Sequence, residues 1–406
     1  MIPGSLKTCR LPSALEEQFL FESKNSQDHL VDLLDQKSEI YNDIHVKGSN
    51  SPKFQQSYRG LSYLSFDTRE GNNPGEDIGK FLRKGIAQHH RKISSADVFR
   101  VKVDLPEEIP SSIGNLLNLQ NLDVKYTYVR TLPKSIWKLQ KLQHLYLNES
   151  HRSKFVSQSR SSSLKNLKTL WGLFLDDFIA IKNGLNKLNN HTKLGLAFQL
   201  ELPQQEELAR WVKGLQYLKS LRLRSVDENG DAHDLHLEGL SRLKNLSTLS
   251  LFGKLEMQSI ENLFADASEF HLSDLRLSAS GLKDDPMQIL GSLSSLKSLC
   301  FYSDSYEGKQ ILFIKKSFSQ LQVLRLRNLK NLEKLKVEEE AMQKLRELEI
   351  RGCKSLKVFN GLKHLMSLRE LKLPNMEDNF TSQIKNDPNF WRHWLPSHEH
   401  RRPLAA

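Results

Sequence analysis

The feature that most constrains this chain is a leucine spacing that changes from three or four residues to two. In residues 132–147, apolar side chains stand at Leu132, Ile136, Leu139, Leu142, Leu145 and Leu147. The wider steps place side chains on one side of a helical turn, and a step of two places them on one face of a strand. A single unit of this kind cannot bury its leucines alone. We therefore expect such units to stack on one another.

The pattern Leu-x-x-Leu-x-Leu, with other apolar residues allowed, recurs along most of the sequence. Its second apolar position is Leu122, Leu145, Leu173, Leu194, Leu221, Leu249, Leu275, Leu299, Leu324, Leu348 and Leu371. These markers lie 21 to 28 residues apart, within the period typical of leucine-rich repeats. Looser matches lie upstream at Leu61-Leu64-Phe66 and Val98-Val101-Val103. The repeats predict an α/β fold: a leucine-rich-repeat solenoid with a concave parallel sheet and a convex side of loops and short helices.

The third residue after the last strand leucine predicts how regular the bends of the solenoid are. A small polar side chain there can hydrogen-bond backbone groups in the bend, whereas a large apolar one cannot. The position holds Thr127, Ser150, Ser280 and Cys353 in some repeats, and Phe178, Val226 and Leu329 in others. We therefore expect an irregular solenoid.

The sequence divides into three segments. Residues 1–58 combine helical apolar spacing with a polar stretch, which predicts a helical and linker leader. Residues 59–374 carry the repeats, and residues 375–406 lose the leucine period. Within this last segment, Trp391, Trp394 and Leu395 are predicted to cover the exposed edge of the last repeat, as a C-terminal cap or tail.

Motif searches indicate neither an enzyme nor a cofactor site. The sequence has no GxxxxGK[ST] phosphate loop and no HExxH or GxSxG motif. His233 and His236 lie in an acidic, loop-like stretch that we interpret as solvated rather than metal-binding. Cys9, Cys300 and Cys353 are too few for a disulfide framework and indicate a reducing compartment. We expect no catalytic residue, no cofactor and no metal.

Targeting signals are also missing from the sequence. The first residues lack the apolar run of a signal peptide, and no 18-residue apolar stretch could span a membrane. The expectation is a cytoplasmic protein without a membrane span. The net charge of +11 is compatible with an acidic partner or with solubility alone.

Side chains between the strand leucines are predicted to face the concave side, because side chains alternate along a strand. The candidate protein-binding residues there are Tyr146, Phe174, Arg222, Arg224, Phe252, Arg276, Tyr302, Arg325, Arg327 and Arg351. Arginine and aromatic residues are the types enriched at binding hot spots. Glu347, Glu349 and Glu370 lie near enough in the pattern to neutralise part of this patch, so a merely solvated sheet stays an alternative. Stacked aromatics with arginines also suit single-stranded nucleic acid, but without a recognised module we expect a protein partner and no nucleic acid.

Several stretches of the sequence resemble a known family. LPEEIPSSIGNLLNLQNLDV (105–124) and LPKSIWKLQKLQHLYL (132–147) resemble the repeats of plant disease-resistance proteins, the intracellular nucleotide-binding leucine-rich-repeat receptors with a coiled-coil N-terminus. YLSFDTREGNNPGEDIGKFL (63–82), LKNLKTLWGLFL (164–175) and AMQKLRELEIRGCKSLK (341–357) match their style. The resemblance covers about residues 59–374. It implies that the repeats sense pathogen effectors or modified host proteins.

The chain departs from this family in one respect. Intact members carry a nucleotide-binding module with a P-loop lysine, whose motif this sequence lacks. KTCRLPSALEEQFL (7–20) resembles the segment where that module ends, with Leu11-Pro12 where many members have a His-Asp pair. The expectation is therefore the C-terminal leucine-rich-repeat portion of such a receptor, without ATP or ADP binding.

The resulting hypothesis is a non-enzymatic recognition module of plant innate immunity. Its partner would be a pathogen effector, a guarded host protein or a nucleotide-binding immune receptor. Two alternatives stay open: the substrate-binding part of a ubiquitin-ligase adaptor, and an inactive truncated receptor fragment. An extracellular receptor would need a signal peptide, paired-cysteine caps and LxGxIP-style repeats, and the sequence has none of these.

Overall fold

A computed structural model of the protein shows short strands and helical turns in a repeating series. It describes the backbone of residues 61–66 and 97–101. It further describes residues 109–386 except 110, 126, 156–163, 177–187, 237–239, 241, 242, 244 and 266–270. The chain divides into two units, residues 1–48 and 49–406, and every described residue belongs to the second. The predicted leader, residues 1–58, lies outside the described residues.

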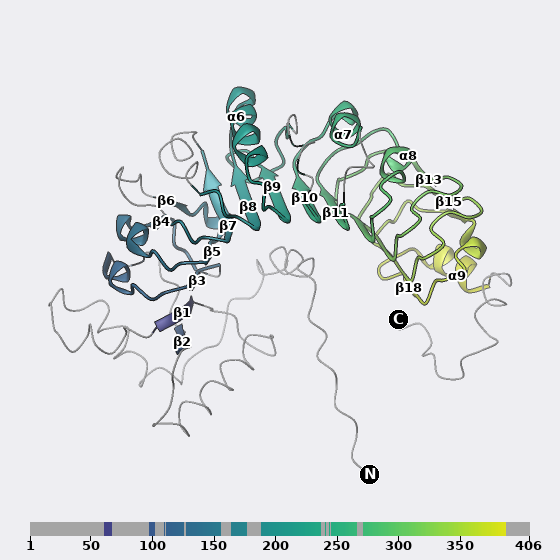
Figure 1. The fold of residues 1–406 in the computed structure, drawn as a ribbon. Coiled ribbons are helices and arrows are strands. Elements are labelled where there is room, and N and C mark those ends of the chain that lie inside the picture. The colour runs from purple at the N-terminus through teal and green to yellow at the C-terminus, as the bar shows by residue number, and fades with distance from the viewer. Residues whose placement is uncertain are drawn as a thin grey trace, which may run out of the picture. The chain divides into compact units, whose positions relative to one another are not determined.

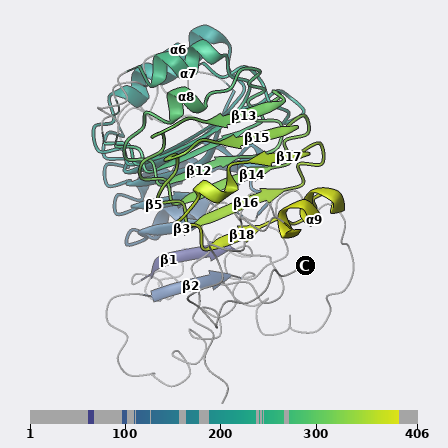
Figure 2. The same ribbon diagram turned by 90° about the vertical axis from the view of Figure 1, so that its right-hand side faces the viewer.

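Within the described part of the chain, most strands form one 13-stranded sheet whose neighbouring strands run parallel (Figures 1 and 2). From one edge to the other, the strands are β18 (Glu370–Lys372), β16 (Glu347–Arg351), β14 (Val323–Arg327), β12 (Ser298–Phe301), β11 (Asp274–Ser278), β10 (Thr248–Phe252), β9 (Ser220–Ser225), β8 (Lys193–Phe198), β7 (Thr169–Leu175), β5 (His144–Tyr146), β3 (Asn121–Asp123), β1 (Leu61–Phe66) and β2 (Asp97–Val101). This is the parallel sheet that the repeats predict.

The register of the sheet confirms the leucine markers, with one exception. From Leu194 to Leu371, each marker pairs with the marker of the next repeat. The marker Leu173 is wrong, because Leu145 pairs with Leu170 and Leu170 pairs with Leu194. The register of β7 shifts between Trp171 and Leu173, at Gly172, whose φ of +80° is easily adopted only without a Cβ. The corrected intervals are 170 − 145 = 25 and 194 − 170 = 24 residues, so the repeat is more regular than its sequence suggests.

The first two strands do not follow chain order. β1 lies between β2 and β3, although β2 comes before β3 in the sequence. Tyr63 accordingly pairs with Val98 on one side and with Asn121 on the other. Both upstream matches to the leucine pattern therefore include strands of the sheet, but β2 forms its outer edge.

The segments that return from one strand to the next are more structured than the predicted loops and short helices. β13 (Gln310–Phe313), β15 (Lys334–Val337) and β17 (Val358–Asn360) form a second parallel sheet, and β4 (Thr131–Leu132) pairs with β6 (Lys154–Phe155). The helical elements are η2 (Ser111–Asn115), η3 (Lys134–Lys138), η4 (Glu149–His151), α6 (Leu202–Lys213), α7 (Met257–Leu263), α8 (Met287–Leu290), η8 (Leu362–His364) and α9 (Asp378–Asn386). Figure 1 shows α6, α7 and α8 on the convex side, opposite the large sheet.

The core is one continuous cluster of apolar side chains between the large sheet and the returning segments. It extends from Ile109 to Ile384 and consists mostly of strand and turn leucines. Each buried leucine contributes about 1.5–3 kcal/mol. At the C-terminal end, α9 adds Phe380 and Ile384 to this core. Trp391, Trp394 and Leu395, predicted for this role, lie outside the described residues.

Some of the predicted small polar side chains hydrogen-bond backbone groups in the bends. The hydroxyl of Thr127 donates to the carbonyl of Val124, and the thiol of Cys353 donates to the carbonyl of Leu326 in the preceding repeat. Ser150 is exposed, contrary to its predicted role, because η4 lengthens that turn by three residues. Ser153 takes its place: it is fully buried and donates to the carbonyl of Val129.

Candidate binding surface on the concave face

The register places two rows of side chains on the concave face, because alternate residues of a strand face the same way. The first row is Asp123, Tyr146, Trp171, Gly195, Arg222, Ser250, Arg276, Cys300, Arg325, Glu349 and Lys372. The second row, two residues further on, includes Phe174, Ala197, Arg224, Phe252, Ser278, Arg327 and Arg351.

Most of the predicted residues occupy these two rows, with Phe174 in the second. The register shift in β7 moves Phe174 to the second row and brings Trp171 to the first, beside Tyr146 and Gly195. Sequence reasoning missed Trp171, although the Trp-Gly pair was a signal for a local break in the strand. Phe174 is only 2% exposed and Tyr302 only 9%. These two aromatics therefore contribute to packing and offer little surface to a partner.

Trp171 lies flat across the neighbouring strand. A Cβ on Gly195 would come within 2.6 Å of its indole ring, so the absence of a side chain on β8 makes room for it. Lys193 Nζ lies 4.4 Å and Arg222 Cζ 5.6 Å from the ring centroid. Both distances allow cation–π attraction. The indole is held in one orientation by these contacts.

A largely buried carboxylate organises the two central arginines. Glu149 Oε1 lies 2.9 Å from Arg222 Nη2 and 3.0 Å from Arg224 Nη1. Glu149 is the first residue of η4, whose turn is capped by the Asn148 side chain accepting from the Ser150 amide. Burial raises the pKa of Glu149, but the charges of both arginines outweigh this and hold the pKa below its usual value. The carboxylate therefore stays ionised.

The residue that follows η4 covers the second row. Arg152 has a positive φ of 54° and donates from Nη2 to the backbone carbonyls of Asp227 and Glu228, both at 2.6 Å. Its guanidinium lies 4.8 Å from the centroid of Phe174. This contact explains why Phe174 is buried, and it extends the positive charge from β9 towards β7.

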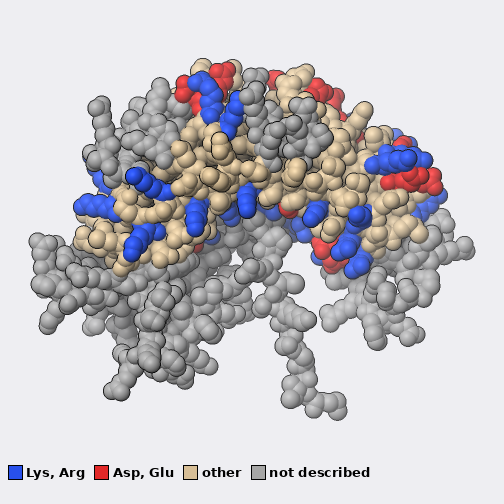
Figure 3. Space-filling view, viewed as in Figure 1, with Lys and Arg blue, Asp and Glu red and all other residues tan. Residues whose placement is uncertain are grey.

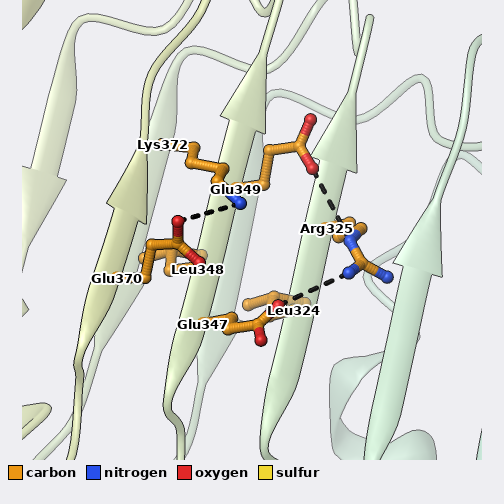
Figure 4. Close-up of a pocket in the computed structure, with 7 residues that line it drawn as sticks. All are labelled: Leu324, Arg325, Glu347, Leu348, Glu349, Glu370 and Lys372. Atoms are coloured by element: carbon orange, nitrogen blue, oxygen red, sulfur yellow. Dashed lines mark hydrogen bonds and ion pairs between the residues drawn. The ribbon is translucent and has the colours of Figure 1, made fainter. Parts of the chain in front are cut away.

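At the C-terminal strands the arginines are neutralised. Arg327 binds Glu349 through two contacts, Nη2–Oε2 at 2.7 Å and Nε–Oε1 at 3.0 Å. Arg325 lies 3.5 Å from Glu347 and 3.6 Å from Glu349, as Figure 4 shows. Burial lowers the pKa of Arg327, but the bond to Glu349 outweighs this and raises it. Glu347 and Glu349 thus have the neutralising role predicted for them.

Glu370 does not contact these arginines and binds Lys372 at 3.0 Å instead (Figure 4). The carboxylates of Glu347, Glu349 and Glu370 thus bind cations at positions 325, 327 and 372, and Arg351 of the second row is a fourth cation of this region. At β7–β9, Arg222 and Arg224 share the carboxylate of Glu149, and Arg152 donates to the backbone carbonyls of Asp227 and Glu228. Cationic and aromatic side chains of β7 to β10 lie against one another at the centre of these rows. We call Trp171, Lys193, Arg222, Arg224 and Phe252 the central strip.

The described residues contain no group of three or more His, Cys, Asp or Glu side chains placed to hold a metal ion. The helices described in this chain are all too short or too polar to cross a membrane.

Comparison with known proteins agrees with the repeat and the sheet. A family described as leucine-rich repeat region matches residues 100–402. The chain belongs to this family. The leucine-rich-repeat fold predicted from the sequence is therefore confirmed by both the register of the strands and the family match.

The plant resemblance is also confirmed. The probable disease resistance protein RF9 of Arabidopsis thaliana is 29% identical over 282 residues, which are 64% of this chain and 26% of that protein. A putative disease resistance protein of the same plant is 26% identical over 401 residues, 95% of this chain and 40% of the relative. The chain spans less than half the length of these relatives. A leucine-rich-repeat protein of Leptospira interrogans has a TM-score of 0.41 and 19% identity, over 84% of this chain and 97% of the other.

Proposed function

We propose that this chain is a non-enzymatic recognition module of plant defence, acting in the cytoplasm, that binds a protein partner on its concave face. The similarity to disease resistance proteins supports the defence role. The partner would be a pathogen effector, a host protein that such effectors modify, or a nucleotide-binding immune receptor. The proposal is based mainly on the central strip.

The central strip has the properties of a preorganised binding site. Glu149 holds Arg222 and Arg224, and Gly195 with Lys193 holds Trp171, so these side chains lose little freedom when a partner binds. Three of the five residues of the central strip are cations, and two of them, Arg222 and Arg224, share the carboxylate of Glu149. Complementary charge speeds encounter with an acidic surface and disfavours a basic one. We therefore expect an acidic patch on the partner, with an apolar group against Trp171.

The test is a comparison of proteins captured from infected leaf extract by the immobilised full chain. Trp171→Ser removes a hot-spot type of side chain, for which losses of about 2 kcal/mol or more, roughly thirtyfold in affinity, are typical. Leu202→Ser on α6 is the control, because Leu202 is exposed on the convex side. A partner retained by the native chain and the control but lost by Trp171→Ser supports the proposal.

Two results would contradict it. Equal capture by Trp171→Ser and the native chain would remove the central strip from the binding surface. Recovery of ubiquitin-ligase core subunits in place of defence proteins would favour the adaptor alternative.

A further inference from the structure

A second surface lies at the edge of the large sheet where its strands begin. Because the strands are parallel, the turns that precede them stack along one edge, about 4.8 Å from one strand to the next. Among the residues that the structure describes, eight cations lie within the four residues before a strand of the large sheet: Lys141, Lys165, Lys168, Lys219, Lys297, Lys344, Arg346 and Arg369. All eight are exposed. We call this row the basic edge.

The basic edge contains no acidic residue. From β3 to β18, the four residues that precede each strand of the large sheet include neither Asp nor Glu. Lys141, Lys168 and Lys344 donate to the side-chain oxygens of neutral amides, Asn118, Gln143 and Gln320 respectively. Figure 3 shows basic side chains at intervals over the band of strands, with few acidic ones between them.

The opposite edge of the large sheet, where its strands end, differs in how its cations are paired. Two of its cations pair with carboxylates: Lys309 Nζ lies 3.1 Å from Glu333, and Lys330 Nζ lies 2.8 Å from Asp304. Lys357 is also close enough to Glu333 to lower the pKa of that carboxyl, after the contribution of Lys309. By contrast, none of the eight cations of the basic edge forms an ion pair within the described part of the chain, whereas Lys309 and Lys330 on the opposite edge do.

Apolar side chains project from the same turns. Met366, Tyr217 and Leu117 are 68%, 63% and 60% exposed, the highest values among the large apolar residues that the structure describes. Each lies three or four residues before a strand of the large sheet. Exposed apolar residues scattered singly need no explanation, but these three all lie on the edge that also lacks acidic residues.

We propose that the basic edge is a docking surface for an anionic lipid bilayer. The basic edge combines lysine and arginine with leucine, tyrosine and methionine and has no carboxylate. A surface of this composition binds favourably at the boundary between lipid headgroups and acyl chains. The cations bind the acidic headgroups, and the apolar side chains insert among the lipids. Nucleic acid is disfavoured because Tyr217 is the only Phe, Tyr or Trp among the described residues of this edge. A row of turns along one edge also suits an extended surface. The concave face stays available for its own partner.

The test measures binding of the full 406-residue chain to sedimented vesicles. Phosphatidylcholine vesicles with about one third phosphatidylserine should retain the chain, and pure phosphatidylcholine vesicles should not. At about 1 M salt, where the Debye length is about 3 Å, the binding should be lost. Each cation near an acidic leaflet contributes about fivefold, so Lys168→Gln with Lys219→Gln and Lys297→Gln should weaken partitioning about a hundredfold. Tyr217→Ser should weaken it several-fold without changing the salt dependence.

A charge-matched control decides whether the edge or the total charge is responsible. Lys309→Gln with Lys330→Gln and Lys357→Gln removes the same charge from the opposite edge and should leave partitioning within about twofold of the native chain. Circular dichroism checks that both variants are folded. Equal loss in the two triple variants overturns the proposal. So does failure of the native chain to bind acidic vesicles, including the case in which it retains single-stranded RNA instead.

Discussion

Replacement of Glu149 by glutamine tests the electrostatic organisation of the concave face. The substitution keeps the size of the side chain and removes the charge that holds Arg222 and Arg224 at 2.9 and 3.0 Å. The two guanidinium groups then repel each other next to a neutral amide. We expect the folded state to be destabilised, with the largest change near β9.

The magnitude follows from the burial of the three side chains. Glu149 and Arg222 are 10% and 11% exposed, and Arg224 is 22% exposed. Loss of one partner of a buried ion pair costs about 3–5 kcal/mol. Both arginines keep contacts with aromatic rings, Arg222 with Trp171 and Arg224 with Phe252. We therefore expect the lower end of this range, about 3 kcal/mol at pH 7.

The contacts of Glu149 with the two arginines also predict that the free energy of unfolding depends on pH. The pKa of Glu149 is lower in the folded state than its ordinary value of 4.5. Its stabilising effect is therefore complete above pH 4.5 and is lost as the pH falls through the lower, folded-state value. The difference in unfolding free energy between the native chain and Glu149→Gln should shrink below pH 4.5.

Urea titration monitored by tryptophan fluorescence measures this difference, because Trp171 lies beside Arg222. Glu347→Gln is the matched control. The carboxylate of Glu347 is 46% exposed and 3.5 Å from Arg325, so its loss should cost less than about 1 kcal/mol. Equal effects of the two substitutions, or a Glu149→Gln effect that does not change with pH, would refute the reasoning.

Three further predictions concern buried groups. His191 is fully buried where neighbouring repeats have leucine, and burial lowers its pKa to about 4. The unfolded chain takes up this proton near pH 6.5 and the folded chain does not, so stability should fall by about 3 kcal/mol from pH 6.5 to 4. In urea titrations, His191→Leu should remove that fall, and a persisting fall would point to other groups. Gly195→Val should displace the Trp171 indole and cost about 1–3 kcal/mol; an unchanged fluorescence spectrum would count against the packing described. Burial raises the pKa of the Cys353 thiol to about 11, so a thiol reagent should modify it at neutral pH only after unfolding, and rapid modification of the folded chain would be inconsistent with this burial.

The leucine pattern predicted the sheet because one constraint, burial of every leucine, determines both the strand positions and their register. It failed at β7 for a specific reason. Leu170, Leu173 and Leu175 fit the leucine pattern with Leu173 as the marker, although the strand pairing makes Leu170 the marker. The two assignments differ only because the register shifts at Gly172. Local spacing cannot distinguish them, whereas pairing with Leu145 and Leu194 can.

Contacts between distant repeats were also beyond sequence reasoning. Glu149 and Arg224 are 75 residues apart, and their contact depends on η4 reaching across β7 and β8. The charge pattern predicted an arginine patch, but only the structure shows that Arg325 and Arg327 bind carboxylates of the neighbouring strand whereas Arg222 and Arg224 share Glu149. The basic edge is visible in the sequence once the strand starts are known.

Site-specific photocrosslinking at position 171 tests most directly whether the central strip contacts a partner. A photoreactive amino acid replaces Trp171 in one variant and Leu202 in another, and each is irradiated in infected leaf extract. If the central strip binds a partner, we expect one dominant protein adduct from position 171 and none of that mass from position 202. An adduct that forms from position 202 and not from position 171 would contradict it.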